Sequence, residues 1–213
     1  MISRKHLLWM LVVTLSDWVL AIVALTAMPR QVPVHWDIQG RVDGLGSSAE
    51  LALVFPFTMT AILVLLVGIG AAGRGSALDR SREAYGRFAV SILGMFMALH
   101  AVFLLAGLGK PVNLPAMALA MVGFLWLVLG NMLGKIRRNT IMGIRTPWTL
   151  KSDVVWERTH RMGGPLMVTH GLLVLLAALL CPWWITLVVF FAGTVLLVFW
   201  ALFYSWRLSQ HVE

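Results

Sequence analysis

The sequence predicts an all-α membrane protein: a bundle of six transmembrane helices with both termini in the cytoplasm. Of its 213 residues, 60% are hydrophobic and only 12% are charged, and the mean hydropathy is +0.86. Soluble domains usually carry about 25% charged residues. This composition argues against a soluble enzyme, a disordered chain and, with Cys181 as the single cysteine, a disulfide-stabilised fold.

Six apolar runs are each close to the length that crosses a bilayer, which is about 20 helical residues. They cover residues 7–28, 51–72, 88–108, 114–133, 165–181 and 183–204. The first follows Arg4 and Lys5, as in a signal peptide, but no clean small-residue cleavage site precedes Pro29, so we expect a retained helix. Only Pro182 divides the last two runs, which are too long for one crossing and predict a tight helical hairpin.

The basic residues orient the bundle. With the N-terminus in the cytoplasm, all of the 17 Lys and Arg residues except Arg30, Arg41 and Lys110 fall on the cytoplasmic side, including Arg74. This distribution follows the positive-inside rule. The net charge of +8 therefore requires no nucleic-acid partner, although a basic cytoplasmic face also attracts anionic lipids of the bilayer.

Two connections contain most of the polar and turn-forming residues outside the spans. We divide the chain into an N-terminal helical hairpin, 1–72, with an extracytoplasmic loop at 29–50, and a four-helix region, 73–213, with a cytoplasmic loop at 134–164. Function is more often carried by loops on a rigid scaffold than by the scaffold.

The outer loop contains PVHWDIQGRVDGLGS. Its candidate ligand residues are His35, Trp36, Asp37, Gly40, Asp43 and Gly44. In an extended strand, His35 and Asp37 point the same way and Trp36 points oppositely, free to lie among lipid headgroups. A purely structural loop, with an Asp cap and an interfacial tryptophan, remains the alternative. One histidine among aspartates lacks the ligand set of a transition-metal site, and we expect no metal or cofactor.

The inner loop contains KIRRNTIMGIRTPWTLKSDVVWERTHRMGG. Ser152 and Asp153 resemble the start of a helix, and the following residues predict a short amphipathic cytoplasmic helix around 152–162 that leads into the fifth span. Trp156 and His160 share one face of that helix, and Trp148 and Trp156 would lie at the membrane interface. The alternative is a solvated, positively charged linker.

These two strings resemble a known family. The inner string is similar to the signature of the SdpI family of bacterial multi-pass membrane proteins, and the outer string resembles a domain of unknown function that often precedes it. The signature residues are Asn139, Gly143, Ile144, Arg145, Thr146, Pro147, Trp148, Thr149, Trp156, Thr159 and His160.

The resemblance implies a six-span immunity and signalling protein of the bacterial cytoplasmic membrane. Its implied partners are a secreted, hydrophobic, membrane-active peptide toxin and a cytoplasmic transcriptional repressor, with no direct contact to nucleic acid. Arg145, Trp148, Trp156 and His160 are then the candidate reporters of toxin binding to the cytoplasm.

Three acidic or basic residues lie within the spans. Asp17 occupies the middle of the first span, where an unpaired carboxylate is costly. His100 lies in the third span and His170 in the fifth, and the sequence does not decide whether either contacts Asp17. They are read as interhelical hydrogen-bonding groups, with a proton-coupled transporter as the alternative function. Gly68, Gly94, Gly123 and Gly130 are read as helix-packing positions.

An intramembrane hydrolase is the third hypothesis. Cys181 has no obvious base nearby in sequence, and neither HExxH nor GxSxG occurs. We therefore expect no enzymatic activity.

Overall fold

The computed structural model describes residues 2–37, 39–73 and 77–211, and of Ala77 and Leu78 the backbone only. Its elements, in chain order, are α1 (Arg4–Ala27), β1 (Gln31–Trp36), β2 (Val42–Ser47), α2 (Ser48–Ala72), the 3₁₀ helix η1 (Ala77–Ser81), α3 (Arg82–Gly107), α4 (Leu114–Leu133), α5 (Pro147–Lys151), α6 (Asp153–Leu180) and α7 (Trp183–Ser209). Within the described residues, six helices are long and apolar enough to cross a membrane, as the sequence predicts. Arg74, one of the cytoplasmic charges, lies outside the described residues.

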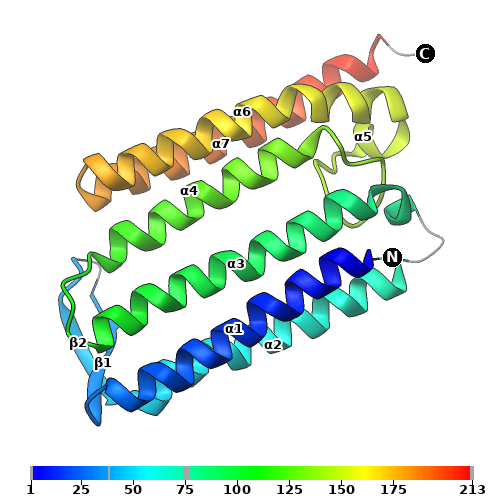
Figure 1. The fold of residues 1–213 in the computed structure, drawn as a ribbon. Coiled ribbons are helices and arrows are strands. Elements are labelled where there is room, and N and C mark those ends of the chain that lie inside the picture. The colour runs from blue at the N-terminus through cyan, green and yellow to red at the C-terminus, as the bar shows by residue number, and fades with distance from the viewer. Residues whose placement is uncertain (1, 38, 74–76, 212–213) are drawn as a thin grey trace.

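The long helices run side by side, with the two distinctive loops at opposite ends (Figure 1). The β1–β2 hairpin covers one end. The loop that contains α5, the start of α1 and the end of α7 all lie at the other end. The even number of crossings and the separation of the two loops therefore agree with the predicted topology.

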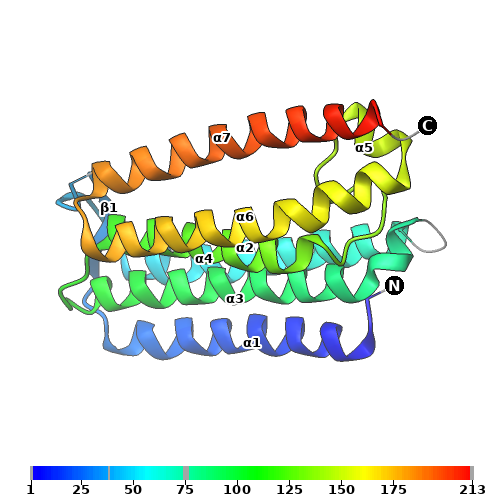
Figure 2. The same cartoon turned by 90° about the horizontal axis from the view of Figure 1, so that it is seen from above.

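Two groups of helices meet through α3 and α4. Helices α1, α2 and α3 pack against one another, α4 packs along α6, and α7 packs mainly against α6 (Figure 2). Helix α3 also contacts α4, so it touches both groups. The division at residue 73 stays a prediction.

Pairs of facing glycines bring α4 and α6 into close contact. A Cβ atom added at Gly123 would lie 2.9 Å from the carbonyl oxygen of Gly171, and one at Gly130 would lie 2.7 Å from that of Gly164. These two packing positions are as expected, because only glycine lets the backbones approach this closely. Gly68 and Gly94 differ: an added Cβ would meet nothing within 4 Å.

The inner helix expected around 152–162 forms the beginning of α6. Ser152 is its N-cap and accepts a hydrogen bond from the backbone N–H of Val155, with Asp153 in the first turn. The helix continues through Gly163, Gly164 and Pro165 to Leu180 without a break. It does so because the two glycines are packed against α4 and Ile144 rather than exposed to solvent.

Candidate functional site

The outer loop forms an antiparallel hairpin, an element that the all-α expectation did not include. Its register places His35 opposite Gly44, and the pairing is irregular on both sides of His35. A Cβ added at Gly44 would lie only 2.9 Å from the Cβ of His35, so glycine is required for the strands to approach.

Asp37 holds the turn of this hairpin. Its Oδ1 accepts hydrogen bonds from the backbone N–H groups of Gln39 (3.0 Å) and Arg41 (2.8 Å), and its Oδ2 accepts one from Arg41 Nε (2.7 Å). Gly40 adopts a φ of 82°, which favours glycine. The bond from the Arg41 backbone N–H, followed by the Arg41 side chain, lowers the pKa of Asp37 below its usual 3.8.

Acidification is expected to loosen this turn. Because the pKa of Asp37 is lower in the folded hairpin, its stabilising effect is complete above the ordinary pKa of 3.8 and is lost as the pH falls through the lowered value. Amide hydrogen exchange of residues 31–47, corrected for the intrinsic pH dependence, should lose protection only at strongly acidic pH. In Asp37→Asn this step should disappear; an unchanged step would assign it to another group.

His35 and Asp43 project into solvent from the hairpin. His35 Nδ1 lies 2.5 Å from Asp43 Oδ1, and the side chains are 73% and 45% exposed. His35 and Asp37, which were expected to point the same way, have separate partners, Asp43 and Arg41. Across the described residues, no group of three or more His, Cys, Asp or Glu side chains could hold a metal ion.

Trp36 lies against the helix bundle rather than free among headgroups. Its ring meets Phe103 of α3 edge to face, with centroids 5.4 Å apart, and it packs beside the buried Val32. Phe103 contacts Phe55 of α2 (5.3 Å), and Phe55 stacks on His100 (4.9 Å). A continuous line of rings therefore leads from the hairpin into the membrane-spanning region.

This line of rings ends at a buried polar pair. His100 Nδ1 lies 2.8 Å from Asp17 Oδ1, and neither side chain is exposed. Asp17 Oδ2 and His100 Nε2 have no hydrogen-bond partner among the described residues. The structure thus answers the question that the sequence left open: α1 and α3 share one hydrogen-bonded carboxyl–imidazole pair.

His170 lies elsewhere, in the α4–α6–α7 group. Its ring meets Trp126 edge to face at 4.9 Å and stacks on Phe190 at 6.2 Å. Its Nε2 is 3.3 Å from Thr194 Oγ1. The three intramembrane candidates are therefore not one cluster.

Asn139 organises the inner loop between α4 and α5. Its Oδ1 accepts from the backbone N–H groups of Ile141 and Met142, both at 2.8 Å. Its Nδ2 donates to the carbonyl oxygens of Arg137 (2.8 Å) and Met142 (3.2 Å). One buried amide thereby satisfies four backbone groups in a segment that has no regular secondary structure.

Trp156 and His160 join this loop to α6. Their rings stack at 4.0 Å, and Trp156 Nε1 donates to the carbonyl oxygen of Ile136 (2.8 Å). His160 Nε2 accepts from the backbone N–H of Ile144 (2.9 Å), so its Nδ1 carries the proton and donates to the Trp156 carbonyl oxygen (2.8 Å). Trp156 is 2% exposed, so the expected interfacial position is wrong: its N–H is needed inside the protein.

Gly143 is required where the loop crosses these rings. Its φ is 114°, and a Cβ atom would lie 2.5 Å from His160 Nε2 and 2.9 Å from Trp156 Cζ2. Arg145, another signature residue two positions later, is exposed, and its Nη1 donates to the Thr140 carbonyl oxygen and, at 3.4 Å, to that of Ile141. Arg145 thus closes the loop from outside.

Thr146 and Thr149 form a capping box at the start of α5, and Pro147 occupies the first helical position. Thr146 Oγ1 also donates to Ser205 Oγ of α7 at 2.9 Å. Trp148 is only partly buried, whereas Thr159 is fully buried. Ser205 was not predicted from the sequence, since nothing in its local pattern indicates a partner 59 positions away.

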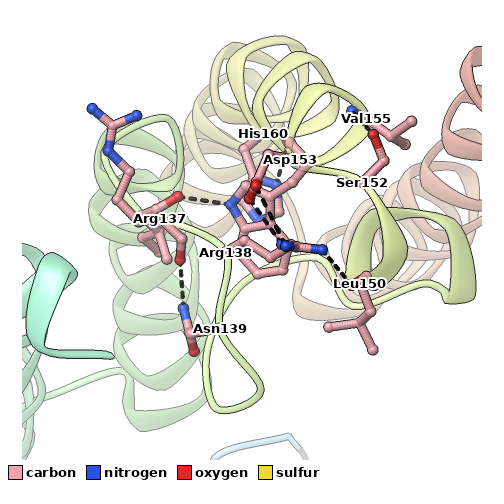
Figure 3. A network of polar contacts seen from close by, with 10 residues as sticks. Arg137, Arg138, Asn139, Leu150, Ser152, Asp153, Val155 and His160 are labelled. Carbon is pink, nitrogen blue, oxygen red and sulfur yellow. Dashed lines mark hydrogen bonds and ion pairs between the residues drawn. The ribbon is translucent and has the colours of Figure 1, made fainter. Parts of the chain in front are cut away.

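Arg138 was also missed as a structural residue. Its guanidinium lies between Asp153 and the carbonyl oxygen of Leu150 (Figure 3). The distance from Arg138 Nε to Asp153 Oδ1 is 2.8 Å, and that from Nη2 to Asp153 Oδ2 is 3.3 Å. This two-point contact fastens the beginning of α6 to the loop that follows α4.

Comparison with known proteins supports the resemblance. Residues 135–205 match the SdpI/YfhL protein family, and residues 12–60 match a domain of unknown function, DUF1648. The chain is 23% identical over 211 residues to the immunity protein SdpI of Bacillus subtilis (strain 168), covering 98% of this chain and 95% of that protein. No solved structure matches the chain. The two matched regions contain the hairpin with parts of its flanking helices and the inner loop with α6, so the chain is similar to the SdpI/YfhL family over residues 135–205 and to the immunity protein SdpI along nearly its whole length.

Proposed function

We propose that this protein protects a bacterial cell from a secreted, membrane-active peptide toxin and reports toxin binding to a cytoplasmic transcriptional repressor. It would act in the cytoplasmic membrane without catalysing a reaction. The hairpin, with His35, Trp36 and Asp43, would contact the toxin, and the inner loop would contact the repressor. The similarity over nearly the full length to a protein named for immunity supports this assignment.

One observation supports the proposal most directly: α3 contacts both the β1–β2 hairpin and the cluster of Trp156 and Met142 at the inner loop. At the outer end, the ring of Trp36 in the hairpin packs edge to face against Phe103 of α3. At the inner end, Ala84 and Phe88 of α3 pack in one hydrophobic cluster with Trp156 and Met142. A small displacement of α3 would therefore be felt at both loops, since packed side chains transmit rather than absorb such shifts.

Signalling requires two arrangements of the bundle that bind toxin unequally, because a ligand with equal affinity for both shifts nothing. The hairpin is suited to this role, since Trp36 joins an exposed ligand surface to α3. The inner loop is suited to reporting because Arg145 and Trp148 are accessible on a frame held by Asn139, Trp156 and His160.

Trp36→Ala is expected to separate protection from insertion. Truncating a central aromatic contact should lower the toxin concentration that the host survives by at least about tenfold. Killing curves of a toxin-sensitive host expressing each variant would measure this effect, with membrane protein levels compared by immunoblot. Trp184→Ala is the matched control, because Trp184 is an exposed tryptophan of α7 at the same end of the bundle.

The inner loop should respond differently. Arg145→Ala or Trp148→Ala should reduce repressor retention at the membrane more than protection. If correctly inserted wild-type protein protects against no related peptide, the immunity proposal is wrong. Equal loss of protein level in Trp36→Ala, Arg145→Ala and Trp148→Ala would instead support a purely structural role for both loops.

Proton-coupled transport is the second candidate. The Asp17–His100 pair favours it, because two of its atoms have no hydrogen-bond partner in the part of the chain that the structure describes. His170, which that hypothesis also uses, lies in the other group of helices. Proton-dependent flux in proteoliposomes that disappears in Asp17→Asn, with protection unchanged, would support transport.

A further inference from the structure

A basic cavity opens at the cytoplasmic end of the bundle, beside the inner loop. Its volume is about 610 Å³, and three segments line it: η1, the residues just after α4, and the first two turns of α6. Trp156 and His160, both nearly fully buried, are among its lining residues. The cavity therefore lies against the two residues, Trp156 and His160, that join the inner loop to α6.

Only some of the cationic side chains that line this cavity form hydrogen bonds or ion pairs within the described part of the protein. Arg138 is held by Asp153 and the Leu150 carbonyl oxygen. The side chains of Arg80, Lys135 and Arg137, by contrast, form no hydrogen bond or ion pair with any described residue. Figure 3 shows the Arg137 side chain extending away from the Arg138–Asp153 contact.

One carboxylate opposes these charges. Glu157 lines the same cavity and likewise has no partner within the described part of the chain. Three free cations against one free anion leave a net positive site. A second cavity of about 410 Å³ shares Arg80 and Lys135 and adds Arg82 and Arg87 together with the carboxylates of Asp79 and Glu83, so a smaller excess of positive charge continues along the start of α3.

The position of the cavity indicates the chemistry of its ligand. Helix α4 ends at Leu133, and the cavity-lining residues follow from Gly134, where the chain leaves the apolar span. Lipid phosphate groups lie at this depth, and Arg and Lys are the usual partners of phosphate oxygens. Arg80 belongs to one helix group and Lys135 and Arg137 to the other, so one anion between them would draw the two groups together.

We propose that this cavity binds a phosphate group, supplied by the headgroup of an anionic phospholipid or by a soluble phosphate compound. Arg80, Lys135 and Arg137 would contact the phosphate oxygens, and Glu157 would limit the affinity. Binding would hold η1 and the end of α4 in one arrangement, next to the Trp156–His160 stack. This inference does not depend on a toxin or a repressor.

The test uses the purified full-length protein in two arms. In the lipid arm, native mass spectrometry compares retention of phosphatidylglycerol and phosphatidylcholine by protein from mixed nanodiscs. In the soluble arm, protein in phosphatidylcholine nanodiscs is titrated with inorganic pyrophosphate, and thermal unfolding is followed. Preferential retention of phosphatidylglycerol assigns the phosphate to lipid, whereas stabilisation by pyrophosphate assigns it to a soluble compound.

Three variants make the result specific. Arg80→Gln/Lys135→Gln should weaken binding of the active probe by about tenfold, because two charge-assisted contacts are lost. Glu157→Gln should strengthen it, an effect that general destabilisation cannot produce. The matched control, Lys151→Gln/Arg158→Gln, removes two exposed cations at the same end that do not line the cavity, and should bind like the wild type. Equal weakening in both double variants, or binding of neither probe, would overturn the proposal.

Discussion

His100→Leu is expected to destabilise the bundle by about 3 kcal/mol, because it leaves the carboxyl group of Asp17 buried without the one side-chain hydrogen bond that the described residues give it. Among the described residues, the hydrogen-bond partner of Asp17 Oδ1 is His100, and Oδ2 has no hydrogen-bond partner. No water is available at this depth to replace the lost hydrogen bond. Reversible unfolding in mixed detergent micelles, followed by far-ultraviolet circular dichroism, would measure the loss.

The double variant Asp17→Leu/His100→Leu tests the reason for that loss. Replacing both members of a buried pair with apolar groups is often neutral, so most of the stability should return. If the double variant is as unstable as the single one, packing against Phe55 rather than the unpaired carboxyl group explains the effect. Restored stability with lost protection would show that the pair serves function rather than folding.

Gly143→Ala is expected to have the second large effect, confined to the inner loop. Alanine at φ 114° costs about 1–3 kcal/mol in backbone strain. Displacing the His160 and Trp156 rings from its Cβ adds a similar overpacking cost. The bonds from Ile144 to His160 and from Trp156 to Ile136 should weaken together, and under the proposed function repressor retention should then fall sharply. Hydrogen exchange of residues 136–146 would report the opening directly.

Gly109→Ala is the matched control for backbone strain alone. Gly109 has a φ of 73°, but a Cβ there would meet nothing within 4 Å, and it lies in the connection between α3 and α4 at the outer end. It should lose about 1–2 kcal/mol without affecting the inner loop. If both variants opened the inner loop equally, the contact of Gly143 with the two rings would not be the cause.

Local patterns in the sequence predicted much of the fold. The number of spans and their orientation follow from apolar run lengths and from the placement of Lys and Arg, because the bilayer imposes both rules on every segment independently. The shared face of Trp156 and His160 follows from helical spacing and is confirmed by their stacking. The Ser152 N-cap is also confirmed. Such a cap can be predicted from local sequence, because its partner, the backbone N–H of Val155, lies only three residues away.

Expectations about tryptophan position were less successful. Trp36 and Trp156 were assigned to the membrane interface, where tryptophan is enriched. Trp156 is instead buried against His160, and Trp36, which is partly buried, packs edge to face against Phe103. An amphipathic ring satisfies either environment, and only the neighbours present in the folded chain decide between them.

By itself, the sequence determined that this chain spans a membrane six times and presents a His-Trp-Asp loop and an Arg-Trp loop to opposite compartments. The tertiary structure alone decided that Asp17 meets His100, 83 residues away, and that His170 does not join them. It also decided that Thr146 reaches Ser205. Which of these polar residues meet depends on the rotation of each helix about its own axis. That rotation is set by packing between helices of similar apolar composition, and the periodicity along a single helix does not encode it.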